Sequence, residues 1–254
     1  MTDLASWLYA VVPADSAPPL ADLTGVAGEP LRLLAEAPIG AVVGSVPRRW
    51  LERDPTGAPT DELAQLVRGH HRVVAALLPH APVVPLRLGT VFSDDDRVRQ
   101  LLRQRTDHLT AALARVRGRA EWGLRIYQAA PEPNPTTPEP VGAVVAGRPG
   151  TAYLLRRRQE RIRQQQARAA ALAQVQQIEQ TLAPLAVAVA HPKSTGAGDD
   201  DKARLIRNST YLVDNHRVAE FRTAVQQCAE ANPGLRLRLT GPWPAYSFIP
   251  EESP

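Results

Sequence analysis

The heptapeptide EWGLRIY, at residues 121–127, starts the half of the chain that decides the fold. Its alternation predicts a β-strand, which Gly123 weakens because glycine offers no side chain to pack. The elements expected downstream are a long helix, two strands, a helix and a strand, at residues 151–182, 185–190, 207–213, 216–231 and 235–239. The resulting order of strand, helix, strand, strand, helix, strand is that of a ferredoxin-like fold, with two helices on one face of an antiparallel sheet.

Upstream of this stretch, the first 118 residues predict a separate α+β unit with a mixed or antiparallel sheet. Short apolar runs predict its strands, of which the second and third can pair as a hairpin: residues 7–12, 31–35, 39–46 and 83–92, the last broken at Gly89. The fold class is therefore α+β with two domains, at residues 1–118 and 119–240. A tail rich in proline and aromatic residues follows at 241–254, and the Pro/Gly-rich stretch 129–149 predicts an exposed loop or linker.

Two helices are expected in the first domain. One begins near Thr60, and its inward stripe includes Val67 and His70. The other is capped by Ser93, carries three aspartates in its first turn and ends at Gly118. Residues 94–96 lack the alternating ligands of a calcium loop, so helix capping is the better interpretation of these aspartates.

Composition indicates a folded protein without membrane insertion. The chain has 254 residues, 44% of them hydrophobic, with a net charge of +4 and a single cysteine. One thiol makes no internal disulfide and no thiolate metal cage. No uninterrupted apolar run approaches the length of a membrane helix, and the first residues lack the pattern of a secretion signal, so a soluble cytoplasmic protein is expected.

Three segments carry a family resemblance, and they occur in the same order along the chain as in the family. The first contains VVPLRLGTVFSDDDRV, LLRQ and EWGLRIY, the second is GTAYLLRRRQERIR, and the third combines TYLVD with LTGPWPAYSF, at residues 71–127, 150–163 and 210–248. Together they resemble the gas vesicle GvpF/GvpL family. Leu88 and Ala245 depart from the family pattern, where phenylalanine and proline are expected. The branch, GvpF or GvpL, stays open.

The resemblance implies a cytoplasmic, minor gas vesicle component with two α+β domains, the second ferredoxin-like. It also implies contact with the small hydrophobic shell protein GvpA and with other gas vesicle proteins, a part in shell assembly, no cofactor and no known reaction. The sequence agrees with the absence of a known reaction, because common catalytic motifs are missing. No Gly-rich phosphate loop, GxSxG elbow or HExxH helix is present. His70 and Cys228 lie on apolar helix stripes, which favours a satisfied core histidine and a buried thiol.

Two features are candidates for partner binding. One is the Arg-rich part of the long helix, which suits an acidic partner because arginine pairs bidentately with carboxylates: Arg156, Arg157, Arg158, Arg161, Arg163 and Arg168. The other is the tail, whose prolines limit its freedom and whose rings supply apolar area: Trp243, Tyr246 and Phe248. For both, the alternative is a structural role, as a solvated helix face and as packing of the tail onto its own domain.

The leading functional hypothesis is an interaction protein of gas vesicle assembly that binds the shell protein. The first alternative is a nucleic-acid-binding protein that uses the Arg-rich helix. It is not favoured, because the strands lack the aromatic signature of RNA-binding sheets. The second alternative is an enzyme of unknown class, which would require a pocket with clustered ionisable side chains. No metal, cofactor or nucleic acid is expected.

Overall fold

The computed structural model describes residues 4–16, 18–51, 60–128, 149–192 and 204–249. These residues form an α+β fold with two sheets. Contacts group the chain into two compact units. The first comprises Met1–Trp122, Leu212–Asn215 and Gly241–Pro254, and the second comprises Gly123–Tyr211 and His216–Thr240. All four tryptophans, at positions 7, 50, 122 and 243, belong to the first unit, so tryptophan fluorescence reports on that unit.

The first unit is built on a five-stranded sheet. Its strands run in the order β2-β3-β1-β4, with β5 also paired to β1, and every pair is antiparallel. Their bounds are Leu4–Pro13 for β1, Leu31–Glu36 for β2, Ile39–Pro47 for β3, Val84–Pro85 for β4 and Val91–Phe92 for β5. The predicted hairpin of the second and third strands is confirmed by the β2–β3 pairing. The predicted strand at 83–92 is two short strands instead.

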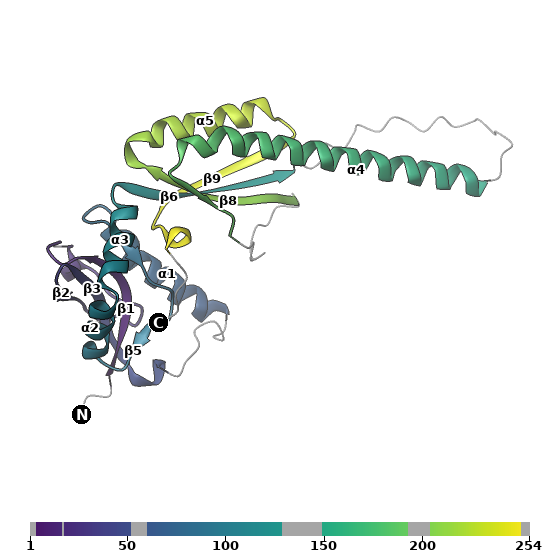
Figure 1. Ribbon diagram of the computed structural model, residues 1–254. Helices are drawn as coiled ribbons and strands as arrows, with labels where there is room; N and C mark the ends of the chain where they lie inside the picture. Colours follow the sequence, from purple (N-terminus) through teal and green to yellow (C-terminus); the bar gives the residue numbers. More distant parts are fainter. Residues whose placement is uncertain (1–3, 17, 52–59, 129–148, 193–203, 250–254) are drawn as a thin grey trace. The chain divides into compact units, whose positions relative to one another are not determined.

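Three α-helices pack on this sheet: α1 at Thr60–Leu77, α2 at Asp95–Gln104 and α3 at Thr106–Val116 (Figure 1). The single helix predicted from Ser93 to Gly118 is wrong in two respects. It is interrupted at Arg105, whose φ of −117° and ψ of 20° leave the helical region. Its cap is Asp94, whose carboxylate accepts a hydrogen bond from the Arg97 amide, whereas the Ser93 hydroxyl donates to Asp94.

Strand β1 is buried on both faces. The Ser6 hydroxyl donates to Asp95 on α2, and the indole of the next residue, Trp7, donates to His70 on α1. Successive strand residues point to opposite faces, so α1 and α2 cover the two sides of the sheet. A bulge between Leu8 and Ala10 then changes which residues face α1. A strand covered on both faces has no polar face, which explains the continuous apolar run.

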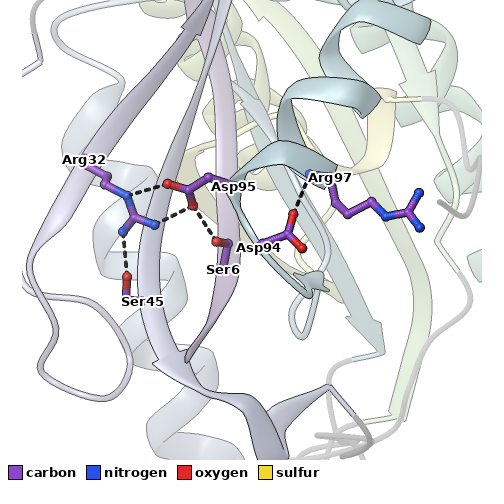
Figure 2. Close-up of polar contacts among 6 residues, drawn as sticks. All are labelled: Ser6, Arg32, Ser45, Asp94, Asp95 and Arg97. Atoms are coloured by element: carbon purple, nitrogen blue, oxygen red, sulfur yellow. Dashed lines mark hydrogen bonds and ion pairs between the residues drawn. The ribbon is translucent and has the colours of Figure 1, made fainter. Parts of the chain in front are cut away.

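A polar cluster ties α2 to the sheet (Figure 2). The Arg32 guanidinium donates to both carboxylate oxygens of Asp95, at 3.2 and 2.5 Å, and to the Ser45 hydroxyl at 2.8 Å. The Ser6 hydroxyl donates to the same carboxylate at 2.6 Å. Burial raises the pKa of Asp95, but the hydrogen bonds from Arg32 and Ser6 outweigh it and hold the pKa below its usual range.

Replacing Asp95 by asparagine should therefore destabilise the first unit. The pair is partly exposed, so solvent screening limits the expected loss to about 1 kcal/mol at neutral pH. Because the folded pKa of Asp95 is depressed, its contribution is present above the unfolded pKa and is lost as pH falls through the folded value. Urea unfolding followed by tryptophan fluorescence tests this. The exposed neighbour Asp96→Asn is the control, and equal losses in both variants would contradict the assignment.

The second unit carries the four-stranded sheet, in the order β7-β8-β6-β9. The bounds are Arg119–Gln128 for β6, Pro149–Leu182 for α4, Ala188–Ala190 for β7, Arg204–Asp214 for β8, Val218–Ala231 for α5 and Leu235–Trp243 for β9. The predicted order of elements is found, although part of the predicted strand 185–190 is a 3₁₀ turn. Within the described residues, the 3₁₀ turns are Leu20–Asp22, Arg48–Trp50, Ala183–Leu185, Asn215–Arg217 and Tyr246–Phe248.

Helices α4 and α5 lie on the same side of this sheet (Figure 1). Ser209 on β8 donates its hydroxyl hydrogen bond to Glu179 of α4, at 2.9 Å. Two residues on, and therefore on the same face, the Tyr211 ring lies 5.2 Å from Phe221 of α5. The buried Cys228 also belongs to α5, as its place on the apolar stripe predicted.

Among the residues of α4 whose side chains are described, only those at the C-terminal end are packed. Ala171, Val175, Ile178 and Leu182 are buried, at the spacing of one helical face. Every residue described with its side chain from 157 to 170 is exposed, and the helix continues well past the ends of the strands (Figure 1). None of the helices in the described ranges combines the length and apolar character needed to cross a membrane.

Candidate interaction surface

The C-terminal tail is held by a buried carboxylate. Glu121 lies near the start of β6, and its carboxylate accepts hydrogen bonds from the backbone amide and the hydroxyl of Ser247, both at 2.8 Å. Burial raises the pKa of Glu121, against the two hydrogen bonds, which lower it. The tail segment is thereby fixed to the first unit by two hydrogen bonds to one side chain. We call this pair the Glu121–Ser247 clasp.

A glycine allows the tail to approach β6 closely. Gly241 has a φ of +135°, and a Cβ placed on it would lie 2.9 Å from the Glu121 carbonyl oxygen and 3.1 Å from the Trp122 ring. L-residues rarely adopt this conformation, and no heavy atom fits in the space. Gly241 therefore has both a conformational and a steric reason to be glycine.

The tail rings differ in exposure. Trp243 is 40% exposed and Tyr246 is 37% exposed, whereas Phe248 is 7% exposed and packs into its own unit. Burial and the Glu121 charge raise the pKa of Tyr246, so its hydroxyl stays neutral. Of the three predicted rings, two present surface to solvent. A role for Phe248 in partner binding stays a prediction, and its visible role is to anchor the tail.

Helix α1 extends this exposed surface. The His71 ring lies 5.1 Å from Trp243 in an edge-on arrangement and 6.4 Å from Tyr246. One helical turn before His71, Val67 is 47% exposed, so its predicted place on the inward stripe is wrong. We call Val67, His71, Trp243 and Tyr246 the aromatic patch. Burial lowers the pKa of His71, which keeps the ring neutral and the patch uncharged at neutral pH.

The predicted arginines lie on α4, in the other unit. Those described with their side chains are all exposed: Arg157, Arg158, Arg161, Arg163 and Arg168. The side chain of Arg156 lies outside the described residues. The two predicted sets of partner-binding residues therefore belong to different compact units, and each is a separate candidate surface.

The sequence matches, over residues 5–250, the family model described as "Gas vesicle synthesis protein GvpL/GvpF". The chain belongs to the GvpL/GvpF family. Gas vesicle protein L of Streptomyces sp. strain CB03234 is 36% identical to it, covering 97% of this chain and 93% of that protein. Gas vesicle protein F of the same strain is 25% identical, covering 97% of this chain and all of that protein. A gas vesicle role follows from this membership.

A solved structure shares the fold of this GvpL/GvpF protein. The crystal structure of gas vesicle protein GvpF from Anabaena sp. PCC7120 superposes with a TM-score of 0.69. It covers 98% of both chains at 17% sequence identity. The α+β architecture with antiparallel sheets is therefore that of GvpF structures.

The clasp explains why two distant motifs of this GvpL/GvpF chain occur together. EWG supplies Glu121 and the crowded Trp122, and the ending LTGPWPAYSF supplies Gly241 and Ser247. In addition, the Thr240 hydroxyl donates to the Gly123 carbonyl at 3.3 Å. These contacts join residues more than a hundred positions apart. The two motifs thus form one structural feature that positions the tail rings.

In this GvpL/GvpF protein, His70 and Cys228, two residue types common in catalysis, are part of the core. His70 is buried, accepts from the Trp7 indole at 3.1 Å and lies 3.0 Å from the Leu86 carbonyl oxygen through its second nitrogen. It is a satisfied core histidine, as predicted. Burial raises the pKa of the Cys228 thiol, which disfavours the reactive thiolate. Among the described residues, no three His, Cys, Asp or Glu side chains gather where they could hold a metal ion.

Sequence reasoning missed four residues of this region: Val67, His71, Glu121 and Ser247. In the sequence, Val67 falls on the inward stripe of its helix. Nothing about His71 distinguishes it from the adjacent His70 as a surface residue. Glu121 offers one usable sign, since an acidic residue beside Trp122 in a predicted strand must find hydrogen bonds if it is buried. That sign predicts that a partner exists without identifying Ser247.

Proposed function

We propose that this GvpL/GvpF protein binds the hydrophobic gas vesicle shell protein, GvpA, together with other gas vesicle proteins, and assists vesicle assembly. The aromatic patch is the observation that carries the proposal. Exposed aromatic side chains held in fixed positions contribute strongly to protein interfaces, because little conformational entropy is lost when they bind. The clasp and Gly241 supply that fixed position for Trp243 and Tyr246.

The physical role is the shielding and placement of apolar subunits. A small, very hydrophobic shell protein would aggregate in water before assembly. A folded protein with an uncharged patch can cover part of that surface and release it to the growing shell. We propose further that the protein does this in the cytoplasm, at the vesicle, without catalysing a reaction and without a cofactor.

We also propose that the second unit is a ferredoxin-like domain. Its sheet order, β7-β8-β6-β9, with α4 and α5 on one face, supports this assignment. This domain would act as a scaffold, because the buried residues at the C-terminal end of α4 attach the exposed part of that helix to the sheet.

The direct experiment is capture of the shell protein from cells that make both proteins. The unaltered chain should retain it. Replacing both Trp243 and Tyr246 by serine should lower the captured amount about tenfold or more, since an aromatic hot spot of an interface contributes about 2 kcal/mol or more. Leu4→Ser, which removes another exposed apolar side chain of the first unit, should leave capture unchanged. Capture that fails with the unaltered chain, or that survives the double change, contradicts the proposal.

A further inference from the structure

The exposed part of α4 carries a strong positive charge, and no described residue of the chain covers it. Within residues 157–170 lie five arginines and one glutamate, and those described with their side chains are all exposed. Arg157 and Arg161 are one turn apart, where like charges destabilise a helix. A helix without tertiary packing gains little from propensity alone. A partner of opposite charge that packed on this part of α4 would therefore stabilise it.

Helical spacing separates the arginines onto different faces. Arg157, Arg161 and Arg168 are followed by Leu172 at steps of four, seven and four residues. At 100° per residue these four positions fall within about 60° of one another. Arg163 lies roughly 140–160° away from Arg161 and Arg168, on the opposite face. We call Arg157, Arg161 and Arg168 the basic track.

The last arginine of the basic track, Arg168, lines a cavity in the same unit. The cavity has a volume of about 190 Å³ and is lined by Arg168 and Leu172 from the track face, together with Gln128, Ala171, Arg204, Leu205 and Ile206. The lining therefore combines two arginines with aliphatic side chains. Leu172 borders the cavity and is 44% exposed. None of the described residues therefore covers this apolar side chain fully.

We infer that the basic track and this cavity together form a docking site for an acidic protein segment, one of whose aliphatic side chains enters the cavity. Carboxylates spaced one helical turn apart would pair with the arginines, whose planar forks suit bidentate contacts. The aliphatic side chain would cover Leu172 and fix the register of the segment. The inference is independent of the proposed shell-protein contact, because the aromatic patch belongs to the other unit.

The chemistry of the cavity favours a protein segment over nucleic acid. Single-stranded nucleic acids are held by aromatic side chains on which bases stack, in addition to positive charge. None of the described residues that line the cavity is aromatic, and the apolar ones are alanine, leucine and isoleucine. Aliphatic surface beside arginine matches an acidic segment that also carries an apolar anchor.

The probe is a labelled helical peptide of about 18 residues, long enough to span roughly 27 Å, with glutamates at every fourth position and one central leucine. A second peptide has serine in place of the leucine. Binding to the full-length chain is measured by fluorescence anisotropy at physiological ionic strength. Arg168→Glu should weaken binding of the leucine peptide about tenfold or more.

The matched control is Arg163→Glu, which makes the same charge change on the opposite face of the same helix. It should weaken binding less than about twofold, because a helix is about 10–12 Å across and the screening length is about 8 Å. Both side chains are exposed, so both variants should keep the fold, which circular dichroism checks. Equal weakening by the two changes would mean diffuse attraction and would overturn the inference.

The cavity is tested by Leu172→Ser. This change should weaken binding of the leucine peptide and leave binding of the serine peptide unchanged, since the two side chains are coupled only if they touch. Equal effects on both peptides would remove the cavity from the site. A single-stranded oligonucleotide is the competing probe. If it binds more tightly than the leucine peptide and is lost in Arg168→Glu, the site is a nucleic-acid site and the inference fails.

Discussion

Replacing Gly241 by alanine is expected to lower the free energy of unfolding of the first unit by about 3 kcal/mol. Two costs add at this position. A φ of +135° strains any L-residue, and the new Cβ would stand 2.9 Å from the Glu121 carbonyl oxygen. That oxygen belongs to the backbone of β6 and has little freedom to move. The tail must shift, which weakens the Glu121–Ser247 clasp.

The matched control for this change is Gly118→Ala. Gly118 has a φ of +67°, but a Cβ there would meet no heavy atom within 4 Å. It therefore carries only the conformational cost, about 1 kcal/mol. Tryptophan fluorescence during urea unfolding measures both variants, since all four tryptophans lie in the first unit. A loss at Gly241 no larger than the loss at Gly118 would show that the close approach is unimportant.

Acid should destabilise the first unit through His70. Burial, with a smaller contribution from the nearby His71, lowers the pKa of this histidine to about 4, although the hydrogen bond to the Leu86 carbonyl acts to raise it. The unfolded chain therefore binds a proton that the folded chain excludes, between about pH 6.5 and pH 4. Stability falls as pH falls through this window, by up to about 3 kcal/mol. Glu121 acts in the opposite direction, because its pKa is raised and acid favours its folded form.

Comparison of variants isolates the histidine from these other groups. His70→Gln should be less stable at neutral pH, since it disturbs the contacts with Trp7 and Leu86, but its stability should vary less between pH 7 and pH 4.5. His80→Gln, at an exposed position, should keep the slope of the unaltered protein. Unfolding free energies across this pH range provide the measurement. An unchanged slope in His70→Gln would assign the acid sensitivity to another group.

Much of the fold could be predicted because local signals and tertiary environment agree. The apolar run of β1 predicts a buried strand, and the prolines and glycines mark the ends of most elements. The same reasoning placed His70 and Cys228 inside, since each shares a helix face with apolar neighbours. Ser93 and Asp94 show the limit of local rules, because either residue type can cap a helix and only the backbone geometry decides.

The candidate surface was harder to predict because it depends on contacts between distant residues. The aromatic tail was recognised from its composition, but its attachment through Glu121 joins residues 126 positions apart. Likewise, the exposure of Val67 follows from where α1 meets the rest of its unit, not from helical spacing. The break at Arg105 is similar, since residues on both sides favour helix. Tertiary packing decides each of these features.

We propose above all that Trp243 and Tyr246 contact the hydrophobic shell protein. Placing a photoreactive phenylalanine analogue at position 246, in cells that assemble vesicles, tests that contact at a single residue. We expect a covalent product with the shell protein after illumination, and none from the same analogue at the exposed position Leu4. Absence of the product at position 246, while vesicles form normally, would mean that this ring does not touch the shell protein.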